Sequence, residues 1–345
     1  MKYYIGLDVS KQETAVCVMS QKQEIFAEFF VETDPYAIGF YINSLGDIDI
    51  ELIGLESGSW SHWLTSELRE LGLPAICMDA RKVSSVLSIK VNKNDRNDAR
   101  GIADCLRCGY YTEVYTKTSN SLALSSILRS RRKLVDQRVE VQHMIRGLLK
   151  TFGIKLKICQ GKSFQETVIQ EMKIIPELAQ KGIEALLACH QQLCEHAKEL
   201  EKHLKQEVAN NPTVQKIMTV TGVGMITSLT FVAEIGDPKR FEESRDVGAY
   251  IGMTPKQYSS GETERMGRIS KQGASDLRSL LTEAGFVVLT RTKGWSKLKA
   301  WGLKIMKKHG PKKAAVAVGR KMAVIMHRMM ITGEEFKYGE VKQAA

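Results

Sequence analysis

The first hundred residues contain three strand-like segments in a row, followed by helical and strand-like segments that alternate. The expected strands are residues 3–9, 14–19, 24–30, 51–55 and 74–78, and the expected helices are residues 35–45 and 59–71. Polar turns separate the early strands, and the strands themselves are rich in β-branched and aromatic residues. Such an order predicts a mixed sheet that is covered by helices.

Acidic residues stand at the ends of two of these strands. The order of the elements is that of a ribonuclease H-like α/β fold, in which the centre of the first strand lies beside the end of the fourth. Asp8 follows the apolar run 3–7, and Glu56 follows the apolar run 52–55. A carboxylate at the end of a buried strand is costly unless something positive neutralises it. We therefore expect Asp8 and Glu56 to lie together beside a cation.

Two further acids, Asp95 and Asp98, lie three residues apart at the start of a helix-like stretch and share one face. One interpretation is capping, with Asp95 as the N-cap and Asp98 in the first turn. Capping does not account for two acids flanked by Lys93 and Arg96, which suit phosphate contacts on either side of a metal site. The acid pair favours two Mg²⁺ ions arranged for attack on a phosphodiester.

The charge balance indicates a polyanionic partner. Lys and Arg number 50 against 39 Asp and Glu, which gives a formal charge of +11. Nucleic acid is the simplest such partner. An anionic membrane is the rival, but the sequence has no run of about 18 apolar residues. No signal peptide is expected either, because Met1 and Lys2 lead straight into a strand, so we expect a cytoplasmic protein without a membrane partner. Acids that converge in so basic a chain point to a nuclease or recombinase.

Two segments, residues 122–152 and 183–204, repeat apolar side chains every seven residues. They predict either an antiparallel helical hairpin or a dimerising coiled coil. His190 lies in the second seam, where we expect a core residue rather than a metal ligand. The chain thus divides into an N-terminal α/β domain (1–115), a helical coiled-coil connector (116–210) and a mainly α C-terminal domain (211–345).

Glycines and basic residues mark the expected C-terminal domain. Gly222 and Gly224 precede an apolar helix in a turn like that of a helix-hairpin-helix, where glycines let backbone N–H groups approach a DNA phosphate. An ordinary turn with glycine caps is the alternative. A basic helix closes the chain, with Lys312 and Lys313 near its start, and its four methionines are expected in the core.

A serine pair, Ser259 and Ser260, is followed by the basic residues Arg265, Arg268 and Lys271. The segment fits an exposed loop. It also fits a nucleophilic serine, because neighbouring cations stabilise the charge that develops when a hydroxyl attacks a phosphate.

The start of the chain has a second possible meaning. The pattern around Asp8 also opens actin-like sugar kinases, which need a later Asp-x-Gly at a strand end. Its one candidate, residues 246–248, does not follow a buried strand, so the kinase interpretation is weak.

The ordered motifs resemble the DEDD transposases of bacterial insertion sequences, of the IS-one-ten type, which are bridge-RNA-guided recombinases. The residues that carry the resemblance are Gly6–Lys11, Leu55–Gly58, Lys93–Ala99, Val220–Gly224, Gly252–Pro255, Ser260–Gly261 and Ile269–Gly273. The resemblance covers nearly the whole chain. The family usually has Thr where Asn94 stands, and its serine immediately precedes the glycine at 261, which favours Ser260 over Ser259.

The resemblance implies a RuvC-like domain in which Asp8, Glu56, Asp95 and Asp98 bind Mg²⁺ or Mn²⁺. It further implies that Ser260 attacks DNA to form a 5′-phosphoserine, and that an element-encoded RNA selects target and donor DNA. In the family the active site joins two protomers within a tetramer. A junction-resolving nuclease that uses water and an inactive nucleic-acid-binding descendant are the alternatives.

Overall fold

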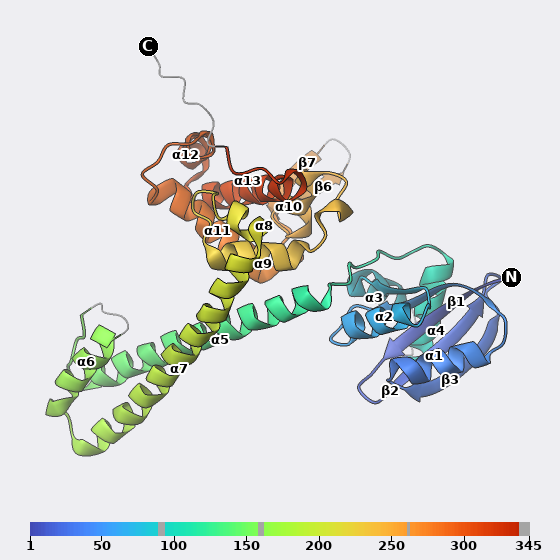
Figure 1. Cartoon of the computed structure of the whole chain (residues 1–345), viewed down its shortest axis with the longest axis horizontal. Coiled ribbons are helices and arrows are strands. Elements are labelled where there is room, and N and C mark those ends of the chain that lie inside the picture. The colour runs from blue at the N-terminus through green and yellow to red at the C-terminus, as the bar shows by residue number, and fades with distance from the viewer. Residues whose placement is uncertain (89–93, 158–161, 261–262, 338–345) are drawn as a thin grey trace, which may run out of the picture. The chain divides into compact units, whose positions relative to one another are not determined.

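The computed structural model describes residues 1–88, 94–157, 162–260 and 263–337. The chain forms two compact units, which we call the N-terminal unit (Met1–Lys117) and the C-terminal unit (Thr118–Ala345) (Figure 1). The first division lies two residues from the predicted boundary at 115. The predicted boundary at 210 falls inside the C-terminal unit, so a separate connector domain stays a prediction.

The N-terminal unit is built on a five-stranded sheet. Its strands are β1 (Lys2–Val9), β2 (Glu13–Ser20), β3 (Ile25–Glu32), β4 (Asp49–Glu56) and β5 (Ala75–Met78). They lie in the order β3-β2-β1-β4-β5. β1 pairs antiparallel with β2 and parallel with β4, so the sheet is mixed. This α/β order is the predicted one, with the ends of the predicted elements displaced by at most two residues.

Helices cover both faces of this sheet. They are α1 (Pro35–Ser44), α2 (Ser61–Glu70), α3 (Ala80–Leu87) and α4 (Asp95–Arg107). Because side chains alternate along a strand, Ile5 and Leu7 of β1 point to one face, where they pack with Ile38 of α1 and Leu64 of α2. The opposite face packs against α4.

The C-terminal unit begins with two long helices, α5 (Ser119–Thr151) and α7 (Glu177–Asn210), joined through α6 (Lys162–Glu171) and the 3₁₀ turn η1 (Met172–Ile174). Ile145 near the end of α5 shares a core cluster with Ile183 near the start of α7, whereas Leu128 shares one with Leu204. Arg131 of α5 and Glu201 of α7 form an ion pair of 2.6 Å. The heptad seams therefore meet within one chain as an antiparallel hairpin, one of the two predicted arrangements (Figure 1).

His190 is a core residue of this hairpin, as predicted. Its ring lies 5.2 Å from the ring of Phe164, and only 1% of the residue is exposed. Burial, and then the charge of Arg138, lower the pKa of His190 below its ordinary value. The unfolded chain therefore binds a proton more readily than the folded one, so the stability that neutral His190 contributes is present above about pH 6.5 and is lost as the pH falls through the lowered pKa.

We accordingly expect the Tm of the unaltered chain to fall as the pH is lowered from about 7.5 to about 5.5. The Tm of His190→Gln should fall less steeply over the same range. Burial also lowers the pKa of His327, in the last helix, α13 (Pro311–Thr332), so this residue contributes in the same direction. The quantity to measure, by circular dichroism, is therefore the difference in Tm between the variant and the unaltered chain. Equal pH slopes for both chains would contradict this account.

The remainder of the C-terminal unit is mainly helical. Its elements are α8 (Pro212–Ile217), α9 (Met225–Ile235), η2 (Pro238–Arg240), η3 (Ser244–Asp246), α10 (Val247–Tyr250), β6 (Pro255–Ser260), β7 (Thr263–Ile269), α11 (Ser275–Thr290), α12 (Lys297–His309) and α13 (Pro311–Thr332). Met322, Met326 and Met329 of α13 are buried in its largest core cluster, as predicted for the methionines of this helix. Within the described part of the chain, no helix is long and apolar enough to cross a membrane.

Candidate active site and nucleic-acid interface

Asp8 and Glu56 lie on neighbouring strands and point to the same face of the sheet. β1 and β4 are paired in parallel, with Leu7 opposite Leu55. Asp8 follows Leu7 and Glu56 follows Leu55, so the two acids lie at equivalent positions of the neighbouring strands. Leu7 and Leu55 belong to the core on the α1–α2 side. Since side chains alternate along a strand, Asp8 and Glu56 project to the opposite face, the one that α4 covers.

The contact of α4 with β1 depends on Gly6. A Cβ atom at Gly6 would lie 2.1 Å from the carbonyl oxygen of Ala99, so only glycine lets the helix backbone rest on the strand. Tyr4 packs against the last turns of α4. The direction from Tyr4 to Asp8 along β1 therefore runs toward the first turn of α4, which carries the other two acids.

The first turn of α4 is capped by Asn94. Its Oδ1 accepts a hydrogen bond from the N–H of Asn97 at 2.8 Å. The predicted N-cap, Asp95, is wrong by one residue, because Asn and Asp cap about equally well and only the backbone conformation distinguishes them. Asp95 and Asp98 both lie in the first helical turn, where the helix dipole favours negative charge. Capping therefore occupies neither carboxylate.

Asp8 and Glu56 share a face of the sheet, but the described acids do not form a closed cage. Among the residues that the structure describes, no three His, Cys, Asp or Glu side chains lie close enough together to hold a metal ion. Carboxylates repel one another unless a cation lies between them. The donor set fits a hard cation nonetheless, because four carboxylates offer only oxygen ligands, as Mg²⁺ and Mn²⁺ prefer.

Two arginines of α4 hold the helix over β3. The guanidinium of Arg96 lies 5.2 Å from the centre of the Phe30 ring. Nη2 of Arg100 donates to Oε2 of Glu28 at 2.6 Å, and this hydrogen bond lowers the pKa of Glu28. The predicted nucleic-acid contact of Arg96 stays a prediction, and that of Lys93 lies outside the described residues.

Gly6→Ala should destabilise the N-terminal unit, because the added Cβ meets backbone atoms of α4 that cannot rotate away. Overpacking of this kind costs about 1–3 kcal/mol, and relief would carry the first turn of α4 away from Asp8. Gly58→Ala is the control, since its Cβ would meet no atom nearer than 4.0 Å. Urea unfolding measures both. Equal midpoints for the two variants would show that α4 does not rest on Gly6.

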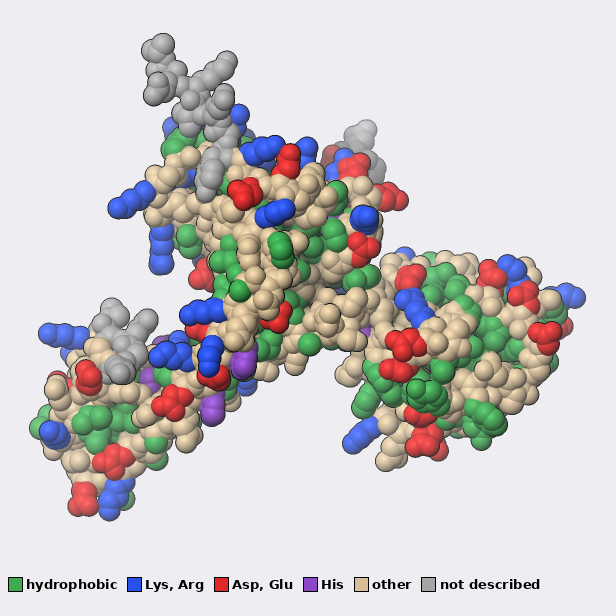
Figure 2. Space-filling model, in the orientation of Figure 1, with side chains coloured by type: hydrophobic (Ala, Val, Ile, Leu, Met, Phe, Trp, Pro, Cys, Tyr) green, Lys and Arg blue, Asp and Glu red, His purple; other side chains and the backbone are tan. Residues whose placement is uncertain are grey.

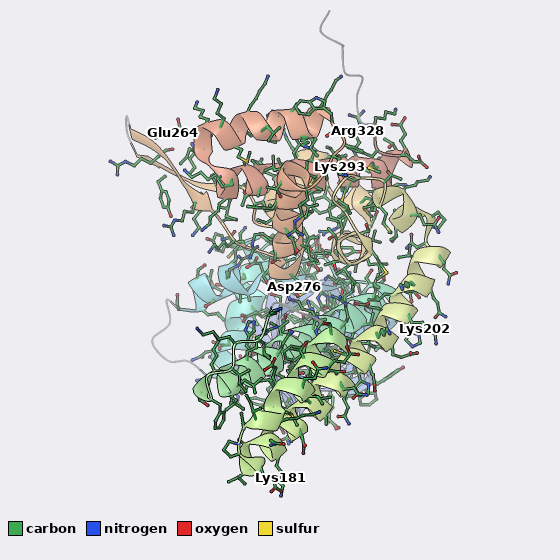
Figure 3. The ribbon with its side chains drawn as sticks, turned by 90° about the vertical axis from the view of Figure 1, so that its left-hand side faces the viewer. Lys181, Lys202, Glu264, Asp276, Lys293 and Arg328 are labelled. Atoms are coloured by element: carbon green, nitrogen blue, oxygen red, sulfur yellow. The ribbon has the colours of Figure 1, made fainter. Side chains whose placement is uncertain are left out.

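Ser260 is the last residue of β6, which pairs with β7 in a hairpin. This hairpin was not predicted: the segment of Ser259 and Ser260 fitted an exposed loop or a nucleophilic serine, and neither interpretation included strands. The described residues 256–259 are all exposed, so no alternation of apolar side chains reveals the strands. The side chain of Ser260 lies outside the described part of the chain. Ser259 Oγ accepts a hydrogen bond from Gln257 Nε2 at 3.1 Å, and the same nitrogen donates to Glu264 at 2.9 Å. Glu264 is labelled at the strand hairpin in Figure 3.

The base of this hairpin is fixed by two glycines with positive φ, Gly252 (+70°) and Gly273 (+81°). A Cβ at Gly252 would lie 2.0 Å from the carbonyl oxygen of Gln272, and one at Gly273 would lie 2.1 Å from that of Tyr250. The N–H of Lys271 also donates to the carbonyl of Gly252 at 3.1 Å. The two glycine motifs thus pack backbone on backbone and anchor the strand that carries Ser260.

The two glycines of the predicted helix-hairpin-helix turn differ. Gly222 has a φ of +84°, and a Cβ there would lie 2.9 Å from a methyl carbon of Val288, so its turn and its packing against α11 both require glycine. A Cβ at Gly224 would meet nothing within 4 Å. Gly224 precedes α9 as its N-cap and lacks a capping side chain, so the exposed amides at this end could meet a phosphate.

A groove of about 1100 Å³ runs between β7, α12 and α13. Four of the predicted nucleic-acid contacts line it: Arg268, Lys271, Lys312 and Lys313. Arg320 and Lys321, which were not among the predicted contacts, line it as well, from the same helix as Lys312 and Lys313. Arg265, also predicted, lies in β7 but is not part of the lining. Basic side chains project from this part of the molecule into solvent (Figure 2).

Known proteins match both units. A family model described as Transposase, of the DEDD type of IS110 elements, matches residues 5–154, and one described as Transposase IS116/IS110/IS902 family matches residues 214–300. The transposase for insertion sequence element IS1328 of Yersinia enterocolitica is 30% identical over 292 residues, which cover 83% of this chain and 85% of the relative. That for element IS1111A of Coxiella burnetii is 26% identical over 340 residues, 97% of this chain and 91% of the relative.

These matches define the class of protein: a DNA transposase of insertion sequences. Within that class, the chain belongs to the IS110 family. A DEDD-type domain indicates a ribonuclease H-like α/β fold and dependence on a divalent metal ion, and DNA is the substrate of such enzymes.

Proposed function

We propose that this transposase is an RNA-guided DNA recombinase that cleaves and rejoins DNA through a 5′-phosphoserine intermediate. The observation that supports this most directly is the division of reactive groups between the two units. Asp8 and Glu56 project toward the helix that begins with Asp95 and Asp98, whereas Ser260 ends a strand of the C-terminal unit. Metal-holding acids alone would serve a nuclease that uses water as the nucleophile. A serine on an anchored hairpin provides a nucleophile that belongs to the protein itself.

Asp8, Glu56, Asp95 and Asp98 would hold Mg²⁺ or Mn²⁺, which supplies charge stabilisation at the phosphodiester. Ser260 Oγ attacks the phosphorus atom and forms a Ser–O–P bond. The bond to the 3′ oxygen breaks, and that oxygen leaves as a hydroxyl after it takes up a proton. Reversal of the same step with another 3′ hydroxyl rejoins the DNA and frees the serine. Neither step needs an external energy source, because one phosphoester replaces another.

A serine hydroxyl is a poor nucleophile at neutral pH without help. Among the described side chains, the acid nearest to Ser260 in the sequence is Glu264. It accepts a hydrogen bond from Gln257 on the exposed hairpin. We therefore propose that the activating groups are the metal-holding acids of another copy, within a dimer or tetramer. We also propose that an element-encoded guide RNA selects target and donor DNA by base pairing, since the chain's charge of +11 suits binding of two polyanions.

A protein–DNA adduct that survives denaturation tests the proposal. The chain is purified with its co-expressed RNA, which is recovered and sequenced, and is then incubated with DNA that matches the RNA and with Mg²⁺. A denaturing gel should show labelled DNA attached to the protein. A nuclease that uses water would cut the same DNA without an adduct, and an inactive descendant would do neither.

A further inference from the structure

The groove between β7, α12 and α13 has a basic rim. Its cationic lining residues are Arg268, Lys271, Lys312, Lys313, Arg320 and Lys321, joined by His309. Among the described residues that line it, none is Asp or Glu. Six cations without an acid concentrate positive potential in a concave surface, and this potential attracts phosphate groups.

The floor of the same groove is apolar. Its lining includes Met253, Ile269, Ile305, Val316 and Val324. Met266 at the groove is 64% exposed. Contact with phosphates requires cations but gains nothing from a hydrocarbon floor, which remains in water unless a ligand with an apolar face covers it.

An aromatic ring completes the floor. Trp301 of α12 lines the groove, and Nζ of Lys321 lies 4.4 Å from the centre of its ring. The ammonium of Lys321 lies over the face of this ring. A nucleobase that stacks on the indole takes the place of this ammonium, and the flexible lysine then turns to the phosphate of the same nucleotide. In a duplex the base faces are already stacked on one another, so a duplex would offer this floor only its phosphates and sugars.

The groove lies close to Ser260 along the β6–β7 hairpin. Met266 of β7 pairs with Gln257 of β6, three residues before Ser260. Three residues of strand span about 10 Å, at about 3.3 Å each. About three stacked nucleotides, at about 3.4 Å each, cover the same length.

We propose that this groove binds unpaired nucleotides, with phosphates on the basic rim and bases on the floor around Trp301. The further statement that these nucleotides flank the phosphate attacked by Ser260 rests on the proposed function, whereas the binding itself does not. Unpaired DNA next to a cut and an unpaired loop of RNA present the same chemistry, namely exposed base faces on a phosphate chain.

Fluorescence anisotropy of the full chain with labelled oligonucleotides tests this. Single-stranded DNA, single-stranded RNA of the same sequence and the blunt DNA duplex are titrated separately. Trp301→Ala should weaken binding of one or both single strands about tenfold, in the range expected for one lost stacking contact, and should change duplex binding less than twofold. The strand type that loses affinity identifies the source of the nucleotides.

Two further variants guard against misfolding. Met266→Ala changes an exposed side chain at the groove and should weaken single-strand binding in the same direction. Trp295→Ala removes a tryptophan that is 53% exposed and does not line the groove, and it should bind all three oligonucleotides unchanged. The proposal is overturned if Met266→Ala and Trp301→Ala bind single strands as the unaltered chain does, or if they weaken duplex binding equally. Single-strand binding without any covalent adduct would instead reject the serine chemistry and leave the groove assignment intact.

Discussion

Ser260→Ala should bind guide RNA and DNA as the unaltered chain does, yet yield no covalent adduct and no recombinant product. The substitution removes the one oxygen that would form the phosphoester while leaving the backbone pairing of β6 with β7 in place. Loss of a covalent nucleophile lowers turnover by a factor of about 1000 or more. A denaturing gel for the adduct and a mobility-shift assay for binding separate chemistry from affinity.

Ser259→Ala is the matched control for this experiment. Ser259 lies one residue away on the same strand, and its hydroxyl accepts a hydrogen bond from Gln257. We expect it to keep substantial activity. An adduct that persists in Ser260→Ala and vanishes in Ser259→Ala would shift the nucleophile by one residue. If neither substitution affects recombination, the serine mechanism is wrong and the nuclease that uses water is the better account.

Asp8→Ala should abolish recombination with little effect on nucleic-acid binding. Asp8 lies near the end of β1, the strand that packs on α4, and projects toward the helix with the other acids. Its loss therefore removes a ligand from the proposed metal site without emptying the core. Loss of a group on which the chemical step depends lowers the rate by about 1000-fold or more. Product formation at several Mg²⁺ concentrations is the measurement.

Asp47→Ala supplies the control for charge, since it removes an exposed carboxylate from a loop of the same unit. It should leave recombination unchanged. Asp8→Ala that recombines DNA at the normal rate would remove this acid from the active site. If Asp8→Ala binds nucleic acid weakly but recombines bound DNA at the normal rate, Asp8 acts in nucleic-acid recognition instead.

Local patterns predicted most of the N-terminal unit. The strands around Asp8 and Glu56 are buried on at least one face, so their apolar side chains show where each strand lies along the chain. The same periodicity identified α5 and α7, although it left open whether their seams meet within one chain. The seams do so because Ile145 packs with Ile183 and Leu128 with Leu204, contacts between residues distant in sequence.

The site was less predictable because its geometry arises from non-local contacts and from polar segments. The β6–β7 hairpin is exposed along its described length, so hydrophobic burial left no alternating pattern to find. Arg320 joins Arg268 at the groove only because α13 and β7, distant in sequence, line the same groove.

The anchoring of the hairpin by Gly252 and Gly273 determines where this chain can tolerate change. Side chains on the described strand residues 256–259 and 264–266 face solvent, so new ones alter what the hairpin touches without disturbing the core. Neither glycine can accept a side chain, because a Cβ would collide with backbone at about 2 Å. Natural variation can therefore diversify the exposed surface of the hairpin, which the proposed mechanism presents to DNA, while the direction in which the hairpin projects stays constant.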